Sequence, residues 1–231
     1  VDGDMRTNDP DIYAVGDCAL VTNRVTGQRQ WSAMGSTANI TGRLAATRIA
    51  GETGPSYPGV LGTGVAKLPG VSMGRTGLTE AAAKKAGFNV ETIVVAADDK
   101  AHYYPGSEKM MMKLICDRDT HKLLGMQALG NGAVDKMTDI AVTAISMGAA
   151  LEELQSCDFA YAPPFSTAIH PFAVAVNALL NKLSGKLESF TPAQYAAGLH
   201  HAGCVHPARL PERAPHPAQP GERSTGRLPP G

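Results

Sequence analysis

The feature that most constrains the fold is a pair of apolar segments joined by a short polar turn. Residues 108–117 and 122–130 are rich in Met, Leu and Ile, and residues 118–121 between them are polar. Two strand-like segments that flank a polar turn predict a β-hairpin. The sheet that contains this hairpin is therefore expected to be antiparallel there.

Two further sets of strands are predicted before the hairpin. Leu68-Pro69-Gly70 is a turn signal between two short apolar segments, which predicts a second pair of strands. Residues 90–97 are rich in β-branched side chains and predict another strand.

Helices are predicted between and after these strands. Thr79 is placed to cap a short helix that Gly87 ends. Apolar residues recur at helical spacing between 134 and 145, and a second long helix follows Pro171 and ends near Gly185. Strands that precede helices favour an α+β fold, with an antiparallel sheet and helices on one face.

Composition divides the chain into three segments. Residues 1–54 combine a buried strand, predicted at Asp11–Asp17, with an Ala-rich helix predicted over residues 31–52. Residues 59–190 contain the α+β unit. Residues 200–231 are rich in Pro and Arg, contain no aromatic residue, and are expected to be a disordered tail because they cannot bury enough apolar surface.

Charge and cysteine content exclude several classes of protein. The 21 basic residues balance the 21 acidic ones, so we expect no binding to nucleic acid, and no apolar run is long enough to span a membrane. The cysteines are too far apart for a metal site or a disulfide framework. We expect reduced thiols in a cytoplasmic protein at Cys18, Cys116, Cys157 and Cys204.

A first candidate site is the Gly-Asp pair at the end of the strand predicted at Asp11–Asp17. Gly16 would let the backbone approach a ligand, and the Asp17 carboxylate would point at a hydroxyl group beyond the strand. The structural alternative is an aspartate that caps a turn. The spacing alone does not decide between these readings.

A longer motif around this pair carries a resemblance. Residues 7–19 read Thr-Asn-Asp-Pro-Asp-Ile-Tyr-Ala-Val-Gly-Asp-Cys-Ala, which resembles the second flavin-binding motif of FAD-dependent pyridine nucleotide–disulfide oxidoreductases. The resemblance implies that Asp17 hydrogen-bonds the ribityl chain of FAD and that Gly16 is the position of close approach. It also implies that residues 1–54 hold the last strand and helix of an FAD-binding α/β domain.

Two tyrosine-containing segments are further candidates. Tyr103 and Tyr104 precede a Pro-Gly turn, and Tyr161 precedes two prolines just before the last predicted helix, which Ser166 or Thr167 could cap. Taken singly, each is an ordinary turn or cap.

The order of these segments carries a second resemblance. Tyr-Tyr-Pro-Gly, the hairpin, the helix and Tyr-Ala-Pro-Pro-Phe-Ser follow one another as in the C-terminal dimerisation domain of coenzyme A-disulfide reductases, persulfide reductases and water-forming NADH oxidases. The resemblance implies a homodimer in which Tyr161 reaches the partner's active site. It implies a similar role for one of Tyr103 and Tyr104, without saying which.

Other parts of that family's pattern do not occur in this sequence. There is no Gly-x-Gly-x-x-Gly motif for the FAD diphosphate and no flavin-proximal redox cysteine. We therefore expect the C-terminal part of an enzyme that uses FAD and NAD(P)H to reduce a small disulfide or persulfide of the coenzyme A type. The alternatives are a water-forming NADH oxidase and a dimerisation module without catalysis of its own.

Overall fold

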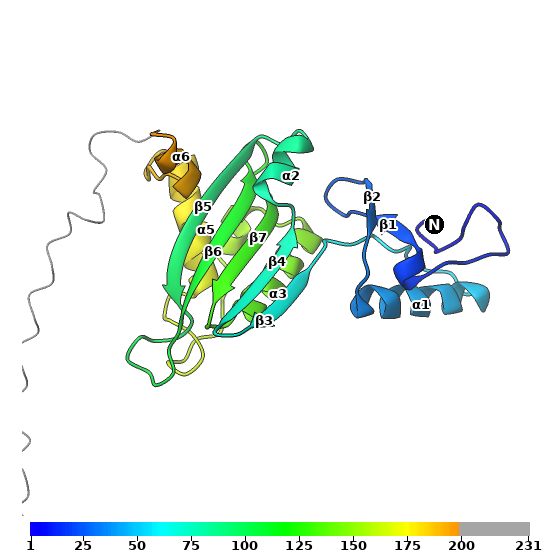
Figure 1. Ribbon diagram of the computed structural model, residues 1–231, viewed down its shortest axis with the longest axis horizontal. Helices are drawn as coiled ribbons and strands as arrows, with labels where there is room; N and C mark the ends of the chain where they lie inside the picture. The colour runs from blue at the N-terminus through cyan, green and yellow to red at the C-terminus, as the bar shows by residue number, and fades with distance from the viewer. Residues whose placement is uncertain (199–231) are drawn as a thin grey trace, which may run out of the picture. The chain divides into compact units, whose positions relative to one another are not determined.

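Five strands form the main sheet of the described part of the chain, which is residues 1–198 of this computed structural model (Figure 1). Their order across the sheet is β3-β4-β7-β6-β5, and every neighbouring pair is antiparallel. The antiparallel sheet expected from the sequence is confirmed. The strands are β3 (Gly64–Leu68), β4 (Val71–Gly77), β5 (Val90–Asp98), β6 (Lys109–Asp117) and β7 (Leu123–Gly130).

The helices predicted in this region are also present. Thr79 caps the first of them by accepting a hydrogen bond from the Ala82 amide (3.2 Å), and Gly87, at φ +90°, follows its end. One short helix, α4, was not predicted. The helices are α2 (Glu80–Lys85), α3 (Val134–Met147), α4 (Leu151–Gln155) and α5 (Pro171–Leu183).

The main core lies between the sheet and the two long helices, α3 and α5 (Figure 1). Alternate residues of β6 point to this side, because side chains alternate between the faces of a strand. Phe172 and Val176 of α5 and Met137 of α3 pack against them and are almost fully buried. The expected α+β fold is therefore confirmed, with both long helices on one face of the sheet. The buried residues of β6 are Met110, Met112, Leu114 and Cys116.

A second, smaller core lies at one end of the opposite face. Ile115 points away from α3 and α5 and packs with Leu78, Ala83 and Leu124. The short helix α2 contributes Ala83 and so covers this end of the sheet. Within the compact unit Val1–Thr191, no helix covers the rest of this face of the sheet.

The segment before the main sheet contains a small hairpin and one long helix. These are β1 (Leu20–Thr22), β2 (Arg29–Trp31) and α1 (Gly35–Ile49), which confirms the Ala-rich helix. The strand predicted at Asp11–Asp17 is wrong: only Tyr13 pairs, in a single bridge to Arg6, and Gly16–Cys18 is a 3-10 turn. A parallel strand needs neighbouring strands for its backbone hydrogen bonds, and residues 1–198 place none beside this segment.

The remaining parts of the chain add little to the fold. A short helix, α6 (Pro192–Ala196), belongs to a separate unit that begins at Pro192. The tail predicted at residues 200–231 lies outside the described residues. The proposed division between residues 1–54 and 59–190 stays a prediction.

A partly buried charge network fixes α5 against the edge strand β5. The Lys182 ammonium group lies 3.1 Å from the Glu91 carboxylate and donates to the Thr92 carbonyl oxygen at 3.0 Å. Arg118 pairs with the other oxygen of Glu91. Because the Lys182 and Glu91 side chains are only 13% and 14% exposed, each depends on its partner to offset the cost of leaving water.

Replacing Lys182 with methionine should therefore destabilise the fold. We expect Lys182→Met to lower the free energy of unfolding by about 1–3 kcal/mol, because Glu91 stays mostly buried with one cationic partner fewer. Lys109→Met is the matched control: Lys109 pairs with Asp98 but is 82% exposed, so a change below about 0.5 kcal/mol is expected. Urea unfolding of both variants measures the difference, and equal effects would contradict the assignment.

Candidate functional site

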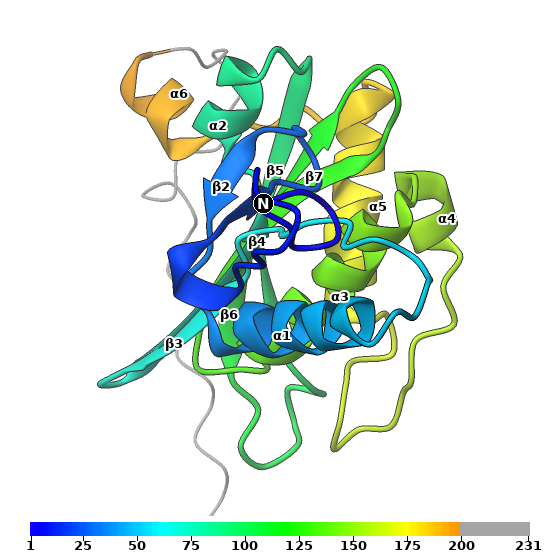
Figure 2. The ribbon, with the colours of Figure 1, turned by 90° about the vertical axis from the view of Figure 1, so that its right-hand side faces the viewer.

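The two tyrosine-containing loops lie at the same end of the main sheet (Figures 1 and 2). The first, residues 99–108, joins the end of β5 to the start of β6. Lys182, near the end of α5, bonds to Thr92, near the start of β5, so the helix runs antiparallel to the strand. The start of α5 and the loop before it, residues 156–170, therefore lie where β5 ends.

The start of α3 connects these loops. A Cβ atom added to Gly132 would lie 2.8 Å from the Cβ of Asp99, so the backbone before α3 is in close contact with the first loop. In the first turn of α3, the Lys136 ammonium group donates to the Phe165 carbonyl oxygen of the second loop at 3.4 Å. The three segments thus form one connected edge.

All three candidate tyrosines are accessible at this edge. Tyr103 is 68% exposed, Tyr104 38% and Tyr161 53%. Within residues 1–198, none of their hydroxyl groups has a hydrogen-bond partner. Phe165 and Ile169, on the same loop as Tyr161, are also largely exposed. The predicted tyrosines therefore lie in loops at one end of the sheet, and their phenol groups are accessible from outside the described chain.

His170 fixes the end of the Tyr161 loop. Its Nδ1 accepts a hydrogen bond from the Phe172 amide (3.2 Å), so His170 is the N-cap of α5. The prediction that Ser166 or Thr167 caps the helix is wrong, because the helix begins at Pro171. Proline favours the first helical position, so the His-Pro pair was the signal that could have located this cap.

His170 is also buried and held by an aromatic contact. Its ring stacks on that of Phe159, with centroids 4.5 Å apart and planes at 23°. Burial lowers the pKa of His170 to about 4, and the nearby positive charge of Lys136 acts in the same direction. The imidazole is therefore neutral at physiological pH.

The second candidate site lies beside the start of α1. Gly16 has φ +68°, a conformation that favours glycine, and a Cβ atom there would lie 3.4 Å from that of Ala38. The Trp31 indole N–H donates to the Asp17 carbonyl oxygen at 2.8 Å and so holds the backbone at this position. Asp17 is exposed, and its carboxylate has no partner within residues 1–198.

The start of α1 adds hydrogen-bond donors to this site. No side chain caps the helix, whose N-cap residue is Met34, and its first turn contains no acidic residue. The first backbone N–H groups of a helix have no acceptor inside the helix and carry partial positive charge. Free carboxylate oxygens next to free N–H groups suit a ligand that has both hydroxyl groups and carbonyl or phosphate oxygens.

The cysteines and the acidic groups form no further site among the described residues. Cys18 and Cys157 are exposed thiols, and burial raises the pKa of Cys116 to about 12, which makes it unreactive. Residues 1–198 contain no cluster of side chains suited to hold a metal ion. No helix among them is long and apolar enough to cross a membrane.

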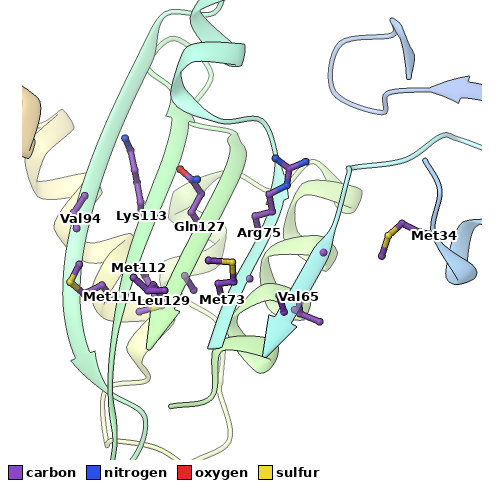
Figure 3. Close-up of a pocket in the computed structure, with 14 residues that line it drawn as sticks. Met34, Val65, Met73, Arg75, Val94, Met111, Met112, Lys113, Gln127 and Leu129 are labelled. Atoms are coloured by element: carbon purple, nitrogen blue, oxygen red, sulfur yellow. The ribbon is translucent and has the colours of Figure 1, made fainter. Parts of the chain in front are cut away.

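The uncovered part of the sheet has an apolar surface (Figure 3). Met73, Leu129 and Met111 lie opposite one another on β4, β7 and β6, and each is between 42% and 51% exposed. The next row consists of Arg75, Gln127 and Lys113, arranged in the same strand order. These two rows line a shallow depression of about 580 Å³, which a chain alone in water would leave exposed.

Comparison with known proteins finds a family and solved structures that this chain resembles. Residues 67–173, which run from the end of β3 to the start of α5, match the family described as the pyridine nucleotide-disulphide oxidoreductase dimerisation domain. A solved structure, a NAD-dependent persulfide reductase from A. fulgidus, superposes with a TM-score of 0.80 at 37% identity, covering 82% of this chain and 35% of that one.

Two curated relatives give similar coverage. The NAD(P)H sulfur oxidoreductase (CoA-dependent) of Pyrococcus furiosus is 37% identical over 76% of this chain and 39% of its own length. An NADH oxidase of Methanocaldococcus jannaschii is 36% identical over 79% of this chain and 40% of its own length. The chain thus spans about two fifths of the length of the relatives it matches.

The depressed pKa of His170 predicts an acid-sensitive contribution to stability. An unfolded histidine titrates near pH 6.5, whereas His170 in the folded chain titrates at about 4. Above pH 6.5 both states are neutral and the residue adds no pH dependence. Between pH 6.5 and 4 only the unfolded state gains the proton, so stability falls as the pH falls.

His170→Asn tests this contribution, because asparagine can still accept the Phe172 N–H bond but has no such proton to gain. Between pH 6.5 and 4 the variant should lose up to about 3 kcal/mol less stability than the wild type. His102→Asn, which removes an exposed imidazole, controls for the change of residue type. Urea unfolding at several pH values measures the slopes, and equal slopes for wild type and His170→Asn would count against the buried-neutral assignment.

Proposed function

This chain belongs to the pyridine nucleotide-disulphide oxidoreductases, and we propose that it is the C-terminal part of a homodimeric, flavin-dependent NAD(P)H enzyme that reduces a small disulfide or persulfide. The observation that carries the proposal is the single edge at which Tyr161 and the Tyr103–Tyr104 pair lie exposed with free hydroxyl groups. The substrate is a thiol derivative of the coenzyme A type.

The tyrosines suit the chemistry of disulfide reduction. When a sulfur–sulfur bond is reduced, a thiolate leaves, and a phenol can donate a hydrogen bond or a proton to it. The ring of a tyrosine also tolerates an apolar pocket, because only its tip is polar. We assign Tyr161 this role in the active site of the partner subunit, with either Tyr103 or Tyr104 beside it.

The site beside α1 fits one part of a flavin. In this proposal Asp17 would accept hydrogen bonds from the ribityl hydroxyl groups, Gly16 would let the backbone approach them, and N–H groups at the start of α1 would be available to an oxygen of the cofactor. When bound, FAD supplies the electron transfer from NAD(P)H to the sulfur substrate. Most of the residues that would hold FAD and NAD(P)H belong to the longer enzyme.

A second candidate function is a water-forming NADH oxidase, which is favoured by the similarity to the Methanocaldococcus jannaschii relative. In that reading oxygen takes the place of the sulfur substrate, and no thiolate leaves. Steady-state assays with a coenzyme A disulfide or persulfide and with oxygen separate the two. A dimerisation module without catalysis is the third reading, and it predicts a colourless dimer for the chain alone.

The first prediction concerns assembly. The purified chain should form a dimer at micromolar concentration, because the match to a dimerisation domain coincides with the exposed apolar row Met73, Leu129 and Met111 on the sheet and with exposed Phe165 and Ile169 on the Tyr161 loop. Sedimentation equilibrium measures this directly. A mass that stays monomeric at all concentrations would contradict it.

The second prediction concerns Asp17. In the flavin-containing enzyme, Asp17→Ala should weaken flavin binding about tenfold or more, since a charge-assisted hydrogen bond contributes about 1.5–3 kcal/mol. The absorbance ratio of flavin to protein after dialysis reports the loss. Asp11→Ala, six residues earlier and also exposed, is the control and should leave the ratio unchanged. Full flavin content in Asp17→Ala would remove the assignment.

The third prediction concerns Tyr161. Tyr161→Phe keeps the ring and removes the hydroxyl, so disulfide or persulfide reduction should fall by about 10–100-fold, or about 1.4–2.7 kcal/mol. Reduction of the flavin by NAD(P)H should hardly change. Stopped-flow measurements of the two half-reactions distinguish these effects.

The action of Tyr161 on the partner subunit has its own test. Subunits with Tyr161→Phe are mixed with subunits that lack the redox cysteine of the longer enzyme. Each mixed dimer then has one site with both defects and one site with neither, so activity should reappear. If heterodimers form and no activity returns, Tyr161 does not act across the dimer.

A further inference from the structure

The loop that carries Tyr161 is closed at its base by an aromatic pair. Phe159, at its beginning, stacks on His170, at its end, with ring centroids 4.5 Å apart. Phe159 also meets the fully buried Phe172 edge-on, with centroids 6.2 Å apart. The two ends of the loop are therefore joined to each other and to the core through three rings.

The His170 ring is fixed in this position from two sides. Its Nδ1 accepts the Phe172 N–H, which ties the ring plane to the first turn of α5. Only 4% of the residue is exposed, and its Nε2 has no partner within residues 1–198. A polar atom buried without a partner is costly. The imidazole must therefore be kept in place by close packing and by the stack on Phe159, because its Nε2 makes no hydrogen bond there.

The loop between these rings has few other attachments to the rest of the protein. Its own turn is formed by the amides of Phe165 and Ser166, which donate to the Ala162 carbonyl oxygen at 2.8 and 3.1 Å. The Ser166 side chain is buried without a hydrogen bond, and the long bond from Lys136 to the Phe165 carbonyl oxygen is the loop's one hydrogen bond to α3 within the described chain. Tyr161 itself stands exposed between the closure and the turn.

We propose that Phe159 and His170 are positioning residues for Tyr161: their stack closes the loop and holds the phenol where a substrate in the partner subunit can reach it. The inference rests on the proposed role of Tyr161. An open loop would spread Tyr161 over many positions, and a catalytic hydrogen bond is lost by displacements of about 1 Å. The pair thus acts through Tyr161 and does not touch substrate.

The structural half of the proposal is tested on the chain as it is. Phe159→Leu keeps an apolar side chain but removes the ring that stacks on His170. His170→Asn keeps a side chain that can cap the helix but removes the other ring of the stack. Hydrogen exchange of the Phe165 and Ser166 amides, which donate to the Ala162 carbonyl oxygen, should become at least tenfold faster in both variants. Phe88→Leu, a partly buried aromatic residue of the smaller core, is the matched control and should leave this loop unchanged. Unchanged exchange in both test variants would overturn the closure.

The positioning half is tested in the longer flavoenzyme. Phe159→Leu should lower kcat for the disulfide or persulfide substrate about tenfold, with KM and flavin reduction by NAD(P)H nearly unchanged. In the double variant with Tyr161→Phe, the loss should equal that of Tyr161→Phe alone, because a displaced phenol and an absent one are equivalent. Losses that multiply would show a general structural effect and overturn the positioning role.

Failure of the two proposals can be told apart. If Tyr161→Phe has full activity, the proposed function of Tyr161 is wrong, while the exchange measurement still decides whether the stack closes the loop. If Tyr161→Phe is impaired and Phe159→Leu is fully active despite faster exchange, the positioning role is wrong and the function of Tyr161 stands.

Discussion

The packing of α5 against the sheet is the contact on which the candidate site depends. Phe172 and Val176 are almost fully buried in the main core, and Lys182 joins Glu91 and Thr92 at the other end of the helix. These contacts fix both the direction and the starting point of α5. Because the helix begins at Pro171, the loop before it must leave the core at the end of β5, beside the Tyr103–Tyr104 loop. One helix position therefore brings together tyrosines that lie far apart in the sequence.

The two faces of the sheet have different roles. One face is covered by α3 and α5 and carries the main core. The other carries exposed methionine and leucine side chains with a row of Arg75, Gln127 and Lys113 beside them (Figure 3). An apolar surface of this kind is normally covered in the working protein. This agrees with the match of residues 67–173 to a dimerisation domain.

Most of the fold could be predicted from local patterns. The β6–β7 hairpin, the turn at Leu68-Pro69-Gly70, the cap at Thr79 and the two long helices depend on neighbouring residues, so their signals lie within short stretches of sequence. The failure at Asp11–Asp17 has a different cause: an apolar run specifies a strand only if other strands are beside it. Ser166 and Thr167 predict the wrong cap for α5, because Ser and Thr are favoured cap residues, whereas the His170–Pro171 pair marks where the helix begins.

The sequence by itself determined the family, the order of the elements and the identity of the chemical groups, since motifs such as Gly-Asp and Tyr-Ala-Pro-Pro-Phe-Ser are written in consecutive residues. Only the tertiary structure decided which groups share a surface. The stack of Phe159 on His170, the buried neutral state of that imidazole and the link from Lys136 to Phe165 each join residues through space. Burial and ring contacts depend on how α5 packs on the sheet, and no local pattern encodes that packing.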